Sequence, residues 1–156
     1  MSVLTLVAAC GASRSVAQRA AACPLSHRDS VFLAGGPVYR DCAVDSKAKL
    51  IPASAKVDYR PSRVGNACYT VELQMVVDAS GKPEPSTIQM IRTNDGAFAD
   101  AVLQTVPSWR YEPATLEQAR VRQIVFEKQT MGTMVVAVPA GRSPPPSSAV
   151  PRKPNC

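Results

Sequence analysis

Residues 68–78 read CYTVELQMVVD, and this stretch decides how the chain folds. Apolar and polar side chains alternate along it, as they do in a strand that buries one of its two faces. The apolar face holds Tyr69, Val71, Leu73, Met75 and Val77. Turn-forming residues follow at 78–82, where Gly81 can adopt a positive φ. The pattern predicts a half-buried strand that ends in a tight turn.

Three further elements are predicted after this turn. Residues 86–92 carry alternating apolar side chains and predict a second strand. A helix with an apolar stripe follows, and Thr93 or Asn94 can cap its first turn. The helix should end or kink just before Pro107, which cannot donate a backbone hydrogen bond. Residues 119–128 predict a third strand.

The order strand, strand, helix, strand predicts an α+β fold, with one helix packed on a face of a small antiparallel sheet of three to four strands. At 156 residues the chain has room for one such domain and its tails. We expect an apolar segment at residues 1–10, a linker at 11–40, the domain at 41–130, a possible extra edge strand at 131–140 and a Pro-rich extended tail at 141–156.

The most specific motif of the chain is Trp109, Arg110, Tyr111, Glu112 and Pro113. Together with the turn at residues 76–82 and the order of the elements, it resembles the C-terminal domain of TonB, the periplasmic energy transducer of Gram-negative bacteria. The resemblance covers residues 41–130. It marks a fold rather than a reaction, and the two aromatic side chains should fill the core beneath the end of the helix.

TonB-like domains capture an extended peptide alongside their last strand, because an edge strand offers unpaired backbone N–H and C=O groups. The resemblance places that strand at Val121, Arg122, Gln123, Ile124, Val125, Phe126, Glu127 and Lys128. Its basic and apolar side chains favour an acidic or mixed peptide. The alternative is that residues 134–138 or an N-terminal segment already covers this edge.

The net charge of +6 lies in the two ends of the chain, because residues 41–130 contain equal numbers of acidic and basic side chains. A nucleic-acid-binding module would concentrate positive charge on a folded face, so we expect no nucleic-acid partner. Basic ends fit an anionic membrane surface or an acidic partner. They could equally be solvated tails.

Residues 7–10 read Val-Ala-Ala-Cys and resemble a bacterial lipobox, which makes Cys10 a lipidation candidate. The apolar run before it is far shorter than the roughly 20 residues that cross a bilayer. A plain export signal or an uncleaved apolar tail remains open. With the TonB resemblance, this segment predicts a membrane-associated protein on the periplasmic side of a Gram-negative envelope.

Cysteine spacing suggests one disulfide, between Cys42 and Cys68, which lie near the two ends of the lead-in to the first strand, residues 41–66. Cys23 and Cys156 could pair with each other or with another chain. No CxxC spacing occurs, so no metal site is predicted.

No catalytic set is recognisable. The only histidine, His27, lies in the expected linker, which argues against Ser/His/Asp and Cys/His arrangements. We therefore expect no enzyme, cofactor or small-molecule substrate. The favoured function is a non-catalytic accessory or structural subunit of an envelope membrane complex, which binds envelope or membrane proteins through a sheet edge and its tails. The alternative is an energy-transducer component that binds outer-membrane receptor peptides for TonB-dependent transport.

Overall fold

A computed structural model of the chain describes residues 15–60 and 67–133. The α-helices are α1 (Val16–Ala22) and α2 (Gly96–Thr105), and the short 3-10 helices are η1 (His27–Gly35), η2 (Pro52–Ser54), η3 (Pro85–Thr87) and η4 (Val106–Ser108). The strands are β1 (Lys49–Leu50), β2 (Ala67–Val77), β3 (Gln89–Thr93), β4 (Tyr111–Glu112), β5 (Ala114–Leu116), β6 (Ala119–Val121) and β7 (Gln123–Thr133). Helices and small antiparallel sheets confirm the α+β class.

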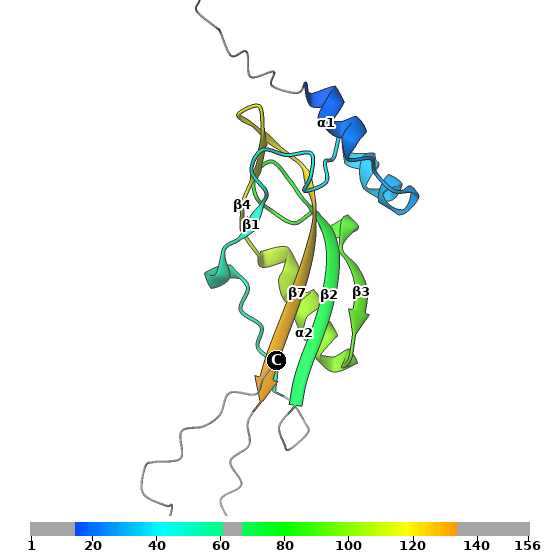
Figure 1. Cartoon of the computed structure of the whole chain (residues 1–156). Helices are drawn as coiled ribbons and strands as arrows, with labels where there is room; N and C mark the ends of the chain where they lie inside the picture. The colour runs from blue at the N-terminus through cyan, green and yellow to red at the C-terminus, as the bar shows by residue number, and fades with distance from the viewer. Residues whose placement is uncertain (1–14, 61–66, 134–156) are drawn as a thin grey trace, which may run out of the picture.

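The main sheet has the strand order β3-β2-β7, and both of its pairs are antiparallel (Figure 1). The strands β2 and β7 each have 11 residues and pair along their whole length. The prediction of one strand at 119–128 is wrong in its bounds, because β6 ends at Val121, Arg122 lies between the strands, and β7 starts at Gln123. Residues 131–133 continue β7 and are not a separate strand, and residues 134–140 lie beyond the described part of the chain.

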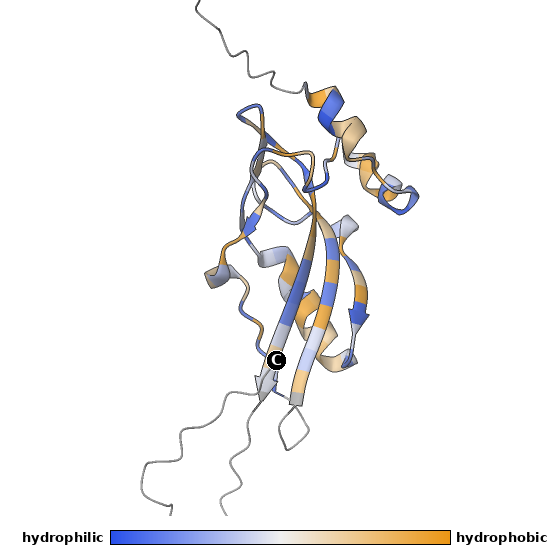
Figure 2. Ribbon diagram, viewed as in Figure 1, coloured by the Kyte–Doolittle hydropathy of each residue, from blue (hydrophilic) through white to orange (hydrophobic). Residues whose placement is uncertain are grey.

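The core lies between this sheet and α2, which packs on one of its faces. The predicted apolar face of β2 is buried there, and Figure 2 shows the alternating hydropathy along the strand. Trp109 is 0 % exposed, and its indole nitrogen donates to the Thr105 hydroxyl at 3.2 Å. Tyr111 is also buried. Both aromatic residues of the motif therefore fill the core below the end of α2, as predicted.

The N-cap of α2 is Asp95, not Thr93 or Asn94. The Asp95 carboxylate accepts a hydrogen bond from the backbone N–H of Phe98 at 2.8 Å. The Asn94 amide is used elsewhere, because it bonds the backbone of β2 at both Cys68 and Thr70. All three residues have side chains that cap helices well, so tertiary contacts decided among them. The helix ends at Thr105, as expected before Pro107.

The motif at residues 109–113 contains the short strand β4, which contacts both the lead-in and the turn after β2. Within it, β4 pairs with β1 from the lead-in. The Tyr111 N–H also donates to the Gly81 carbonyl at 2.8 Å. Gly81 has φ +83°, and a Cβ atom there would collide with the Tyr111 carbonyl oxygen. The turn after β2 therefore requires glycine both for its backbone conformation and for this contact.

The arm, residues 15–42, was predicted for the most part to be a linker, and that prediction is wrong. It forms α1 and η1 and packs against the sheet face opposite α2. Phe32 is 1 % exposed and contacts Val76 and Ile124. The Asp29 carboxylate accepts a hydrogen bond from the Gln74 side chain at 3.0 Å. Local composition does not encode this packing, because its partners lie more than 40 residues away along the chain.

Arg122 connects the arm to the start of β7 through side-chain hydrogen bonds. Its guanidinium pairs with both carboxylate oxygens of Glu84 at 2.6 Å. It also donates to the backbone carbonyls of Gly36 and Phe32, at 2.6 and 3.3 Å. Bidentate Arg–carboxylate pairs of this kind are among the stronger hydrogen bonds in proteins. The hydrogen bonds to Glu84 raise the pKa of Arg122.

The disulfide of the arm joins Cys23 to Cys42, with Cα atoms 5.9 Å apart. The predicted Cys42–Cys68 pair is therefore wrong, and Cys68 has an interaction of its own. The arm folds back onto the sheet and so brings Cys23 beside Cys42, which residue spacing alone could not show. Closing a loop of this size stabilises a fold by about 3 kcal/mol in the chain-entropy model. Cys10 and Cys156 lie outside the described residues.

Gly81→Ala should lower the free energy of unfolding by about 1–3 kcal/mol, because it introduces both backbone strain and a collision. Gly96→Ala is the matched control, since a Cβ atom there meets no atom within 4 Å. It should leave stability unchanged or raise it slightly. Chemical denaturation measures both, and equal effects of the two variants would contradict this account of the turn.

Phe32→Ala should destabilise the protein by about 3–5 kcal/mol, because it leaves a cavity between the arm and the sheet. The control is Val31→Ala, since Val31 is 58 % exposed beside it. Thermal unfolding followed by circular dichroism should show a clear loss only for Phe32→Ala. An unchanged melting temperature for that variant would mean that the arm does not contribute to the fold.

Candidate functional site at the outer edge of β7

The strand β7 lies at the edge of the main sheet and bonds only β2 along its inner side. In an antiparallel pair, alternate residues direct their backbone groups to the partner strand or away from it. The backbone N–H and C=O of Thr70 on β2 bond Asn94, on the side of β3. Its partner across the pair, Thr130, therefore points its backbone groups outward. The same alternation sends the backbone groups of Phe126, Lys128 and Gly132 outward.

The beginning of this edge is occupied by the arm. The Tyr39 N–H donates to the Arg122 carbonyl at 3.0 Å, and the Ile124 N–H donates to the Tyr39 carbonyl at 2.9 Å. Tyr39 thus forms a short parallel bridge with Gln123. An N-terminal segment covering the edge was one alternative from the sequence, and it holds for this first part.

The predicted binding strand therefore divides into two parts. Residues 121–124 are not available. Val121, at the end of β6, pairs with Ala114 of β5, and the next three residues are bonded to the arm or lead-in. Among the described residues, none is bonded to the outward backbone groups of Phe126 and Lys128. The outward backbone groups of Thr130 and Gly132 also have no bonded partner among the described residues, and the sequence prediction did not include these two positions. Matching β7 to the full length of β2 would have found them.

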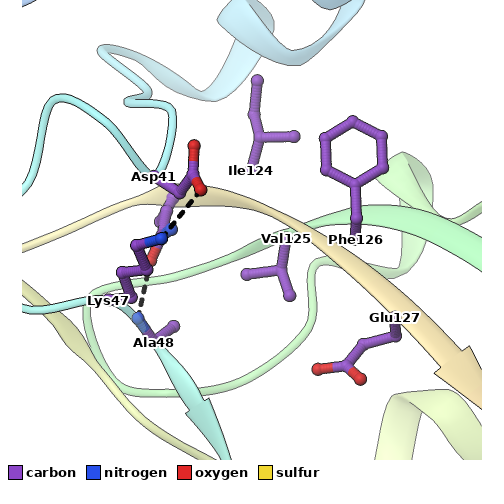
Figure 3. Close-up of a pocket in the computed structure, with 8 residues that line it drawn as sticks. Asp41, Lys47, Ala48, Ile124, Val125, Phe126 and Glu127 are labelled. Carbon is purple, nitrogen blue, oxygen red and sulfur yellow. Dashed lines mark hydrogen bonds and ion pairs between the residues drawn. The ribbon is translucent and has the colours of Figure 1, made fainter.

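A groove runs along the first part of this edge, between β7 and the lead-in. It is lined by Asp41, Lys47, Ala48 and residues 123–127. Lys47 and Asp41 form an ion pair at 2.9 Å, and the Ala48 N–H donates to the Gln123 side chain at 2.6 Å. In Figure 3, Ile124 and Phe126 point to one side of β7 and Val125 and Glu127 to the other. An added strand would therefore meet two chemically different faces.

Glu127 points to the same side of β7 as the core residues. Burial raises the pKa of its carboxyl, and an interaction with the Tyr111 hydroxyl opposes that shift. Burial and the nearby Glu127 charge also raise the pKa of Tyr111. Within the described chain, this buried hydroxyl has no partner in hydrogen-bond geometry, so the carboxyl acts on it at longer range.

The motif residues lie away from this edge. Trp109 and Tyr111 are in the core, Glu112 is exposed on β4, and Arg110 donates to the carbonyls of Ser108 and Trp109. The motif therefore builds the fold and does not form the candidate site. Cys10, the lipidation candidate, is not among the described residues.

Within residues 15–60 and 67–133, no three His, Cys, Asp or Glu side chains gather as metal ligands would. In the same part of the chain, no helix has the length and apolar character needed to cross a bilayer. No protein-family model matches the chain, and no curated protein shows a significant sequence match.

Glu127→Gln should flatten the dependence of stability on pH. Because the folded-state pKa of Glu127 is raised, the folded chain binds this proton more tightly than the unfolded chain, whose value is about 4.3. The wild-type protein should gain stability as the pH falls through the folded pKa toward that value. The variant lacks this gain and should melt at a higher temperature at neutral pH. Melting curves from pH 4 to 8 measure it, with Glu112→Gln as the exposed control; an unchanged slope for Glu127→Gln would contradict the assignment.

Proposed function

We propose that this chain is a non-catalytic protein-interaction domain of the TonB C-terminal type, which binds an extended segment of a partner along the outer edge of β7. The observation that carries the proposal is the row of outward backbone groups at Phe126, Lys128, Thr130 and Gly132. Each backbone hydrogen bond to a new strand contributes about 0.5–1.5 kcal/mol net, so a few of them give modest, reversible binding.

The β2, β3, α2, β7 order and the buried Trp109 support a TonB-like fold. The Cys23–Cys42 disulfide supports an oxidising compartment such as the periplasm. On these grounds we propose an accessory or structural subunit on the periplasmic side of an envelope membrane complex. Its partners would be envelope or membrane proteins, with a lipid at Cys10 or the basic ends as contacts to the membrane.

Tyr39 gives a precedent within the molecule for this mode of binding. It shows that the outer side of β7 accepts a backbone partner, in parallel orientation, at the point where the free edge begins. A partner strand would continue in the same line. The arm thus fixes one end of the available edge, and the binding segment would start beside Phe126.

Thr130→Pro should abolish partner binding while leaving the fold intact, because it removes an outward N–H and proline is tolerated on the open side of an edge strand. The matched control is Gln129→Pro, which removes an N–H directed to β2 and should unfold the domain. Circular dichroism checks both folds. Binding is measured by photo-cross-linking in cells, with a photoreactive amino acid in place of Lys128.

The expected result is a cross-link to an envelope protein that disappears in the Thr130→Pro background. A photoreactive group at Asp100, on α2, should give no such cross-link. A cross-link that survives Thr130→Pro, or one that joins Lys128 to another part of the same chain, would overturn strand addition. An outer-membrane receptor as the cross-linked protein would support the energy-transducer role instead of the accessory role.

A further inference from the structure

The sheet face opposite α2 is only half covered by the described residues. The arm covers one half, where Phe32 packs on Val76 and Ile124 and Asp29 bonds Gln74. Beyond Gln74, which is buried, Glu72 on the same face is half-buried, and Arg92 and Lys128 are exposed. This open half is formed by Glu72, Ile91, Arg92, Phe126 and Lys128.

Two large apolar side chains stand exposed on the open half. Phe126 is 61 % exposed and Ile91 is 54 % exposed, and they line the same depression together with Glu72 and Lys128. Ile91 is the extra residue of a β-bulge, because the pairing of β3 with β2 shifts between Glu72 and Leu73. Bulges commonly redirect a side chain, and here the bulged residue lines the depression on this face.

A row of charged side chains crosses the open half next to this apolar pair. Glu72 on β2 lies opposite Arg92 on β3 and opposite Lys128 on β7, so all three side chains share one face. Lys128 forms a long ion pair with Glu72, with 3.7 Å between the Lys128 Nζ and a Glu72 carboxylate oxygen. Among the described residues, none forms an ion pair or hydrogen bond with the side chain of Arg92, whose backbone pairs with Glu72. Two cations thus share one carboxylate, which leaves an excess positive charge beside Phe126 and Ile91.

The arm shows what chemistry this face accepts. It covers the other half with an apolar side chain, Phe32, and a carboxylate, Asp29, that lie three positions apart. Residues 1–14, 61–66 and 134–156 carry no Asp or Glu side chain, so these segments do not match that chemistry. A partner segment that carries Asp or Glu fits the positive charge of Arg92 better.

We infer that the open half of this face is a second docking surface, which binds a partner segment carrying an apolar side chain beside a carboxylate. The apolar side chain lies between Ile91 and Phe126, and the carboxylate pairs with Arg92. This surface uses side chains on the sheet face and does not require strand addition at the β7 edge. The two can therefore be tested separately.

The test is a selection of random peptides displayed on phage against the full chain. We expect the enriched peptides to carry aromatic or aliphatic residues next to Asp or Glu. A selected peptide should bind about tenfold or more weakly to Arg92→Glu, since this replaces an attraction by a repulsion, and also to Phe126→Ser. Binding should weaken as the salt concentration rises.

Two controls separate this surface from other causes. Arg120→Glu makes the same charge change at an exposed position of β6 and should leave binding unchanged. Thr130→Pro should also leave it unchanged, because the edge is not used. Enrichment of basic or purely apolar peptides, or no peptide sensitive to Arg92→Glu, would overturn the inference. Peptides lost only in Thr130→Pro would overturn it while supporting strand addition.

Discussion

The uninterrupted pairing of β2 with β7 is the constraint on which the rest of the structure depends. Because the pairing runs through all 11 residues without a bulge, the alternation of β2 is imposed on β7. Each β7 residue is thereby assigned one face and one backbone direction. A shift of one residue would send Phe126 into the core and Glu127 to the outside. Both proposed binding surfaces follow from this single register.

The arm determines how much of these surfaces remains open. It takes one half of the sheet face with Phe32 and the first outward position of β7 with Tyr39. Arg122 fixes it there by bonding two of its carbonyls, and the disulfide at Cys23 limits how far it can move away. An edge strand exposed along its whole length invites aggregation, so partial coverage also protects the domain.

The two proposed surfaces meet at Phe126 and Lys128, whose backbone groups point outward and whose side chains lie on the open face. Backbone pairing supplies affinity that depends little on sequence, whereas side-chain contacts distinguish one partner from another. A strand at the edge and a segment on the face would occupy adjacent sites. Such an arrangement suits the proposed role of a small domain that joins other proteins.

Local pattern was enough to determine the alternating strand at 68–78, the glycine turn, the helix before Pro107 and the buried Trp109, because each depends on neighbouring residues and elementary backbone chemistry. The sequence alone did not reveal the folded arm, the Cys23 disulfide, the Asp95 cap or the true length of β7. These depend on which distant segments meet in space. The arm meets sheet residues more than 40 positions away, and Asp95 caps α2 while Asn94 bonds β2. Such local choices of similar energy become distinct only when the sheet is assembled.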